Sequence, residues 1–130
     1  MSPPLKHLGK TSNQPVDRVD LIPWTGGPIA VRLECADFTA LCPVTGHPDF
    51  ATLEIDYVPD RHLVETKSLK LYLWRYRGEK TFNEHLVDAV AGDLHRQLRP
   101  HWLRVTGRFR PRGGIAVTVG AERGDRERRP

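Results

Sequence analysis

The period at which apolar residues recur changes twice along this chain, and this change constrains the fold more than any other feature. Apolar and polar residues alternate in IAVRLECADF (29–38) and again in ATLEIDYV (51–58), which is the period of a half-buried strand. After residue 60 the spacing becomes helical, because Leu69, Leu73 and Tyr76 fall on one face of a predicted helix at about 68–77. The first half of the chain therefore predicts two strands and then a helix.

A second helix is predicted to begin at TFNE. Thr81 can cap its first turn, Glu84 can reach back to the capped end, and Pro100 lies just beyond its end. WLRVTGRF (102–109) and GIAVTV (114–119) then alternate again, and the Arg-Pro-Arg-Gly-Gly segment between them suits a hairpin turn.

The predicted order is therefore strand, strand, helix, helix, strand, strand. Two hairpins around a helical pair favour an α+β domain, in which a four-stranded antiparallel sheet has two helices on one face. The other face and the sheet edges remain uncovered, so we expect the chain to form an oligomer.

The 130 residues suit one domain, which we place at 29–120. Residues 1–28 are rich in Pro, Gly and polar residues without a sustained period, which predicts an arm that packs on the domain without forming its core. Residues 121–130 contain four arginines and three acids and predict a charged, solvated tail.

Composition excludes some classes of function. The net charge is +4, but the excess is mild and dispersed, and no basic face with interleaved aromatic residues is evident, so we do not expect direct nucleic-acid binding. No apolar run is long enough to span a bilayer, so no membrane association is expected. The N-terminus lacks the apolar core of a secretion signal, which favours the cytoplasm.

The two cysteines are predicted to be free thiols. In a reducing compartment a structural disulfide is uncommon, and Cys35 and Cys42 lack the CxxC spacing of a zinc site, so no metal site is predicted. Cys35 alternates into a strand and is predicted to be core, whereas Cys42 follows the strand in CPVTGHPD, where the chain turns. From the residues alone Cys42 is either a packed side chain or a nucleophile, and Asp49 is either a turn residue or a functional acid.

Three separated segments, FTALCPVTGHPDFA (38–51), ETKSLKLYLWRYR (65–77) and RPRGGI (110–115), resemble the short, single-module form of the QueF-type nitrile reductases. These are NADPH-dependent 7-cyano-7-deazaguanine reductases, and the likeness extends over 7–115. The resemblance implies the tunnelling fold (T-fold), which is shared with GTP cyclohydrolase I. It also implies a homo-oligomeric barrel with active sites at subunit interfaces.

The resemblance further implies the four-electron reduction of the nitrile of 7-cyano-7-deazaguanine to an amine, with two NADPH, in the pathway to queuosine in tRNA. Cys42 would attack the nitrile carbon to form a thioimide, because a thiolate is a strong nucleophile. Asp49 would supply the protons that the nitrogen needs as its bond order falls. Enclosure of the imine would protect it from hydrolysis.

Substrate contacts are implied for Val64, Glu65, Thr66, Asn83 and Glu84. A carboxylate at Glu84 matches two adjacent N–H donors on the guanine-like edge, although the capping box explains Glu84 without any ligand. Asn83 stands where the family usually has a histidine, so a proton-carrying role at this position is in doubt.

Cofactor contacts are implied for Thr66, Lys67, Ser68, Lys70, Arg112 and Gly113. The two lysines lie at a helix start, where backbone N–H groups and cations favour a phosphate, and an arginine suits the 2′-phosphate of NADPH. The alternatives are a solvated helix face and a plain hairpin turn. No GxGxxG motif is present, so spacing alone does not suggest this cofactor.

Two other functions remain open. One is a T-fold enzyme with zinc-dependent cyclohydrolase or pterin chemistry, and stoichiometric zinc would favour it. The other is a basic RNA-binding module in which Cys42 is structural, and salt-sensitive RNA binding that survives Cys42→Ala would favour it.

Overall fold

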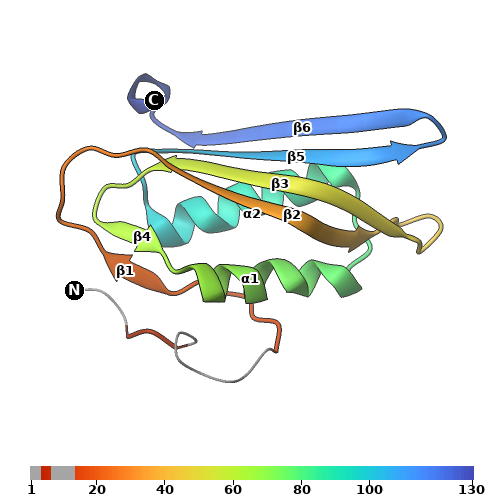
Figure 1. Ribbon diagram of the computed structural model, residues 1–130, viewed down its shortest axis with the longest axis horizontal. Helices are drawn as coiled ribbons and strands as arrows, with labels where there is room; N and C mark the ends of the chain where they lie inside the picture. Colours follow the sequence, from red (N-terminus) through yellow and green to blue (C-terminus); the bar gives the residue numbers. More distant parts are fainter. Residues whose placement is uncertain (1–3, 7–13) are drawn as a thin grey trace.

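A four-stranded antiparallel sheet organises the protein, whose computed structural model describes residues 4–6 and 14–130. Figure 1 shows two helices on one face of this sheet. This arrangement confirms the predicted α+β class and the order of the main elements. The strands, in their order across the sheet, are β2 (Val31–Leu41), β3 (Pro48–Val58), β5 (Trp102–Arg112) and β6 (Ile115–Gly124).

The two helices cover different parts of the sheet. α1 (Thr66–Trp74) lies beside β2 and continues into a short 3-10 helix, η1 (Arg75–Gly78). α2 (Asn83–Leu98) packs on β5 and β6. Among the residues that the structure describes, no helix has both the length and the apolar character needed to cross a bilayer.

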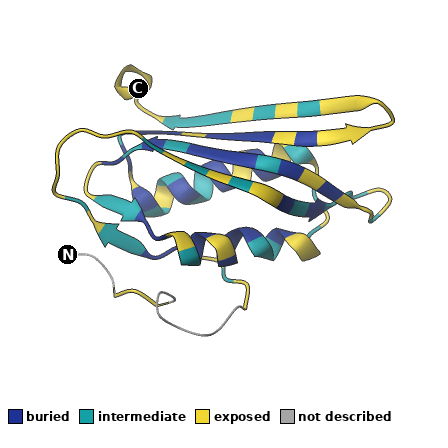
Figure 2. Cartoon of the chain, viewed as in Figure 1, coloured by how far each residue is buried: buried dark blue, intermediate teal, exposed yellow. Residues whose placement is uncertain are grey.

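The core lies between the helices and the inner face of the sheet, where buried residues alternate with exposed ones along the strands (Figure 2). Its inner side chains come mainly from the central strands and from α2, which explains why these strands alternate and α2 has helical spacing. The largest fully buried side chains are Leu53, Ile55, Tyr57, Leu71, Tyr72, Leu86, Val87, Val90, Leu94, Leu98, Leu103 and Val105.

β2 contains an irregularity between Cys35 and Phe38, where the register with β3 shifts. A bulge of this kind leaves one strand with extra residues and bends it. Cys35 itself is half-buried and packs against the core, in agreement with the strand predicted there.

The N-terminal arm contributes more to the fold than its composition predicts. β1 (Leu21–Pro23) pairs with β4 (His62–Val64) in a separate two-stranded sheet, and Val19 belongs to the hydrophobic core. Both strands have only three residues, too few to establish a period, so the alternation could not reveal them. The part of the predicted arm at 1–3 and 7–13 lies outside the described residues.

The predicted boundary of the C-terminal tail at residue 121 is wrong. β6 continues to Gly124 and pairs with the start of β5, and η2 (Arg126–Arg128) follows it. Three charged residues of this segment find an opposite charge: Arg123 contacts Asp88 at 2.6 Å, and Glu122 contacts Arg126 at 3.3 Å and Arg104 at 3.7 Å.

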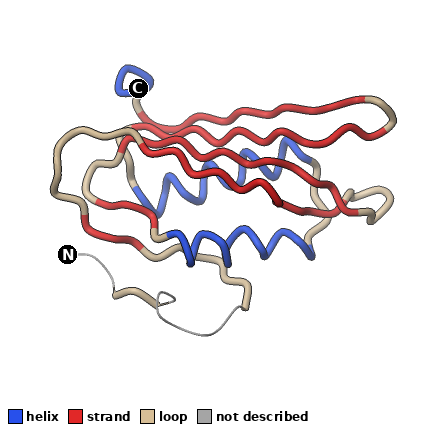
Figure 3. The backbone as a smooth tube through the Cα atoms, viewed as in Figure 1, coloured by secondary structure: helices blue, strands red, loops and turns tan. Residues whose placement is uncertain are grey.

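Three connections gather at one end of the molecule. The turn between β2 and β3, the turn between β5 and β6, and the loop that leads into α2 all lie at this end (Figure 3). β1, β4 and the start of α1 lie toward the opposite end. The residues that the sequence singles out are divided between these two ends.

Candidate functional site

Cys42 lies in a tight turn that begins where β2 ends. Its N–H donates to the carbonyl oxygen of His47 at 2.9 Å, and its own carbonyl accepts from the N–H of Gly46 at the same distance. Gly46 adopts a φ of +74°, which a residue with a side chain rarely tolerates. The CPVTG sequence therefore forms a closed loop that holds the thiol at the end of the sheet, half-exposed.

This loop also lowers the pKa of the thiol. The hydroxyl of Thr45 is the main cause of a lowered pKa for Cys42, followed by the backbone N–H groups of Thr45 and Val44 and by the positive charge of Arg112. Each of these groups stabilises the thiolate more than the thiol. An exposed thiol with a lowered pKa has the character of a nucleophile rather than of a packed side chain.

Asp49 lies in β3 and not in the turn, because the strand begins one residue earlier, at Pro48. It pairs directly with Ala40 of β2, so its side chain shares the helix-facing side of the sheet with the buried Ala40. The Asp49 side chain is only 9% exposed. Its carboxylate accepts a 2.6 Å hydrogen bond from Arg112 Nη1.

Arg112 reaches Asp49 from the β5–β6 hairpin. The register of β5 with β6 shifts between Phe109 and Arg112, after which Arg112 pairs with Ile115 and closes the turn. The turn residues Gly113 and Gly114 have φ values of +60° and +82°, as a two-residue hairpin of this type requires. The structure thus joins Arg112 to the Cys42–Asp49 pair, a contact that the sequence did not predict.

Asn83 and Glu84 lie near the Cys42 turn in the same chain. Backbone hydrogen bonds tie the last residue of β2 to the loop before α2, from Leu41 N–H to the Glu79 carbonyl and from Thr81 N–H to the Leu41 carbonyl. α2 then begins at Asn83.

The capping box predicted at the start of α2 is wrong. Phe82 occupies the N-cap position without a side-chain cap, and the Thr81 hydroxyl donates to the Phe82 carbonyl instead. The helix starts one residue later than the box requires, so Glu84 is the second residue of the helix and not the third. Within the described part of the chain, the exposed Glu84 carboxylate forms no hydrogen bond or ion pair, and it remains available for a ligand.

The other predicted contacts gather around the start of α1. Thr66 and Lys70 are exposed, whereas Val64 is buried and donates its N–H to the Tyr57 hydroxyl at 3.1 Å. The Lys70 ammonium lies 5.1 Å from the centre of the Trp74 ring.

Glu65 caps α1. Its buried carboxylate accepts from the N–H groups of Lys67 at 2.6 Å and Ser68 at 2.8 Å. The Ser68 hydroxyl is also used inside the fold, since it accepts from Asp20 N–H and donates to the Glu65 carbonyl. The helix start was predicted to attract a phosphate, but the carboxylate already there satisfies those N–H groups and opposes an anion.

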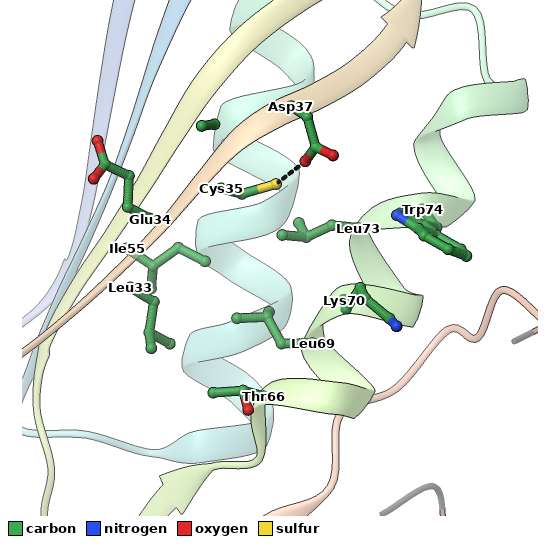
Figure 4. Close-up of a pocket in the computed structure, with 11 residues that line it drawn as sticks. Leu33, Glu34, Cys35, Asp37, Ile55, Thr66, Leu69, Lys70, Leu73 and Trp74 are labelled. Carbon is green, nitrogen blue, oxygen red and sulfur yellow. Dashed lines mark hydrogen bonds between the residues drawn. The ribbon is translucent and has the colours of Figure 1, made fainter. Parts of the chain in front are cut away.

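A cavity of about 310 Å³ lies between β2 and α1. Figure 4 shows Thr66 and Leu33 at one end of it and Trp74 and Asp37 at the other. Cys35 also faces this cavity, where burial and then its hydrogen bond to Asp37 raise the pKa of the thiol. This cavity contains neither Cys42 nor Asp49.

The predicted residues therefore form two groups. Thr66 lies at the Leu33 end of the cavity, and Cys42 follows Leu33 by nine residues. At about 3.3 Å per residue in a strand, this separates Thr66 from Cys42 by roughly 30 Å. One copy of the chain brings Cys42, Asp49, Asn83, Glu84 and Arg112 to one end, and Val64, Glu65, Thr66, Lys67 and Ser68 to the other.

The described residues contain no group of three His, Cys, Asp or Glu side chains that could hold a metal ion. Thr45 is a residue of the candidate site that the sequence analysis did not single out. Its position three residues after Cys42, in a segment with Pro and Gly, is the signal that could have revealed a hydroxyl folded back on the thiol.

Comparison with known proteins extends the likeness across most of the chain. The model of the QueF-like protein family matches residues 48–128. A 7-cyano-7-deazaguanine reductase of Anaeromyxobacter sp. (strain K), named as NADPH-dependent, is 48% identical over 104 residues, which are 80% of this chain and 85% of that protein. The chain belongs to the QueF-like family.

Other proteins of the same name are equally similar. That of Halorhodospira halophila is 51% identical over 92 residues, 71% of this chain and 78% of its own length. That of Syntrophus aciditrophicus is 52% identical over 92 residues, 71% of this chain and 66% of its own length. Among solved structures, an archaeosine synthase QueF-Like in the apo form superposes with a TM-score of 0.71 at 24% identity, covering 77% of this chain and 98% of that one. This likeness confirms the predicted T-fold.

Proposed function

We propose that the chain is an NADPH-dependent nitrile reductase that converts 7-cyano-7-deazaguanine to 7-aminomethyl-7-deazaguanine, in the biosynthesis of queuosine. The names of relatives that are about half identical to this QueF-like chain support the reaction. The observation that carries the proposal is the thiol of Cys42, which has a lowered pKa and lies at the sheet end where Asp49 is buried.

Cys42 performs the covalent step in this proposal. The thiolate adds to the nitrile carbon and leaves a thioimide bound to the protein. Asp49 is the proton carrier for the nitrogen, which must receive protons as its bonds to carbon are reduced. Burial of Asp49 under the sheet end keeps this transfer away from bulk water.

Glu84 and Asn83 recognise the base. The Glu84 carboxylate has two oxygens that can accept from two adjacent N–H groups on the guanine-like edge. The Asn83 amide can donate or accept a hydrogen bond but does not titrate, so in this chain proton transfer is assigned to Asp49. Both residues approach from the first turn of α2, next to the Cys42 turn.

The cofactor-side residues have the chemistry that a phosphorylated dinucleotide requires. Thr66 offers a hydroxyl and Lys70 an exposed cation, both at the cavity beside α1, and Lys67 offers a second cation in the first turn of the same helix. We assign cofactor binding to these three residues, while Glu65 and Ser68 fix the backbone that holds them. Bound NADPH would supply the hydride that the nitrile carbon needs.

Contacts from Val64 and Glu65 to the substrate, and from Ser68 and Gly113 to the cofactor, remain predictions. Val64 and Ser68 are buried in one copy, and the Glu65 carboxylate caps α1. Gly113 is the most accessible of these residues, since a Cβ added to it would meet no atom within 4 Å.

A complete site in this proposal combines two copies of the chain. The Cys42 group of one copy meets the Thr66 group of another, because one copy holds them at opposite ends. β2 and β6 lie at the edges of the sheet, and their pairing between copies would close the barrel expected of a T-fold. We expect such an enzyme to work in the cytoplasm on the free base, without binding tRNA or a membrane.

The test follows NADPH absorbance when the full chain is mixed with 7-cyano-7-deazaguanine. We expect turnover by the wild type, none by Cys42→Ala, and a loss of about a hundredfold or more by Asp49→Asn, which cannot carry a proton. Melting curves of the three proteins provide the control for folding. Absence of turnover by the folded wild type, or unchanged turnover by Cys42→Ala, contradicts the proposal.

A further inference from the structure

Arg112 stands out among the residues around Cys42 because its guanidinium is ion-paired at the end of the molecule that carries the Cys42 turn. Its Nη1 donates to Asp49 Oδ1 at 2.6 Å. Within the described residues no other side chain forms a hydrogen bond or ion pair with the Asp49 carboxylate. The resemblance assigns Arg112 to the cofactor, but the structure commits its guanidinium to the carboxylate beside the thiol.

The hairpin geometry explains how Arg112 reaches this position. The register shift after Phe109 and the two glycines with positive φ let β5 continue past its pairing with β3 and return immediately as β6. The Asp49 side chain is 9% exposed and that of Arg112 is 42% exposed. The carboxylate is thus fixed by its strand, and Arg112 reaches it from outside.

The same charge acts on the thiol. After the hydrogen bonds from Thr45 and Val44, the charge of Arg112 is a further cause of the lowered pKa of Cys42. A guanidinium is always charged and can hold a carboxylate in a defined orientation. One side chain therefore serves two anionic groups that act together.

We propose that Arg112 is a positioning residue for the covalent step. Before any cofactor binds, its guanidinium holds Asp49 in place and supplies a positive charge to both the Asp49 carboxylate and the Cys42 thiolate. This inference rests on the proposed function, since it concerns the addition of Cys42 to a nitrile. The thiol first gives up its proton, and the thiolate then forms an S–C bond as one π bond between carbon and nitrogen breaks. Asp49 passes a proton to the nitrogen, so that thiol and nitrile together give the thioimide and the step needs no reductant.

Two measurements made without NADPH distinguish the proposed role of Arg112 from a role in cofactor binding alone. The first is the pH profile of Cys42 alkylation by iodoacetamide, followed by mass spectrometry of the Cys42 peptide. The second is the rate at which 7-cyano-7-deazaguanine forms an adduct on Cys42. Arg110→Ala is the matched control, since it removes an exposed arginine from the same strand that has no partner among the described residues.

For Arg112→Ala we expect the alkylation profile to move to higher pH, because loss of the guanidinium raises the pKa of the thiol. Adduct formation near neutral pH should slow severalfold, because less thiolate is present and Asp49 has lost the side chain that holds it. Arg112→Lys keeps the charge without the planar fork, so it should restore the alkylation profile more fully than the adduct rate. Arg110→Ala should match the wild type. If Arg112→Ala has a clearly lower melting temperature than the wild type, Arg112→Gln replaces it in both measurements.

An Arg112→Ala protein that matches the wild type in both readouts, and differs only in a raised KM for NADPH, overturns the inference. A shift of equal size in Arg110→Ala also overturns it, because the effect would then be one of net charge. If the wild type forms no adduct, the proposed function fails, and the alkylation profile still decides whether Arg112 acts on the thiol.

Discussion

At the scale of single residues, the two thiols differ in what surrounds each sulfur. Hydrogen bonds from Thr45, and then from Val44, lower the pKa of Cys42, whereas burial and the neighbouring Asp37 raise that of Cys35. The thiolate of Cys42 therefore persists to lower pH than that of an ordinary cysteine, and its reactivity falls as the pH drops through its pKa. Electrophiles near neutral pH should thus select Cys42.

Glu84 is expected to act on substrate affinity and not on stability. In Glu84→Gln one oxygen and the negative charge are lost, so the KM for 7-cyano-7-deazaguanine should rise about ten- to a hundredfold, the effect of losing charge-assisted hydrogen bonds. The free energy of unfolding should change by less than about 0.5 kcal/mol, because the side chain is exposed and does not cap α2. Steady-state kinetics and urea denaturation provide the two measurements.

Asp88→Asn is the control for Glu84, since it removes an exposed acid from the next turn of the same helix. Its KM should match that of the wild type. A clear loss of stability with normal kinetics in Glu84→Gln would assign Glu84 a structural role instead.

The sequence identified some of these residues but not their contacts. Cys42 and Asp49 emerge because the strand alternation stops before Cys42 and a family resemblance pairs it with Asp49. The ion pair between Arg112 and Asp49 joins residues 63 positions apart. It depends on a register shift in β5, and no local pattern specifies such a shift.

At the scale of elements, the start of α1 is held by Glu65. In Glu65→Ala the N–H groups of Lys67 and Ser68 lose their acceptor in a buried place, so we expect the free energy of unfolding to fall by about 1–3 kcal/mol. Urea denaturation monitored by circular dichroism measures this loss. This loss of stability has a local cause, because the carboxylate accepts from two N–H groups that have no acceptor within the helix itself.

Asp125→Ala is the matched control for Glu65. Asp125 also caps a helix, but η2 is three residues long and exposed, and the cap accepts from Glu127 N–H at 3.0 Å. Its removal should cost less than about 0.5 kcal/mol. Equal losses in the two variants would contradict the role assigned to Glu65.

The elements that the sequence predicted well are those with many repeats of one period. β3 and α2 have eleven and sixteen residues, and their buried faces match the alternation and the helical spacing. β1 and β4 are too short for either pattern and depend on pairing between distant segments. The end of β6 was missed because its charges look solvated in sequence, and only their partners on α2 and β5 reveal the pairing.

At the scale of the whole molecule, the division of the predicted residues between two ends is the main consequence of the fold. The sheet carries the Cys42 turn and the Arg112 hairpin to one end, while α1 starts near the other (Figure 1). The distance along β2 is too long for a side chain to bridge. A site that uses both groups must therefore combine two copies.

Subunit mixing tests this division. Cys42→Ala and a Lys67→Ala/Lys70→Ala double variant should each be inactive alone. Refolded together in equal amounts, they should recover activity in about a quarter of sites, because each half of a site has an even chance of being intact. No recovery in a mixture shown to contain both variants in one oligomer would contradict a shared site, since in an undivided site every copy keeps its own defect.

The central claim is that Cys42 forms a covalent bond to a nitrile, and the mass of the protein incubated with 7-cyano-7-deazaguanine and no NADPH tests it most directly. We expect the wild type to gain the full mass of the substrate, because addition expels nothing, and fragmentation to place it on Cys42. Cys42→Ala should gain nothing. A wild-type protein that is folded and gains no mass, or that gains it on Cys35, would contradict the account.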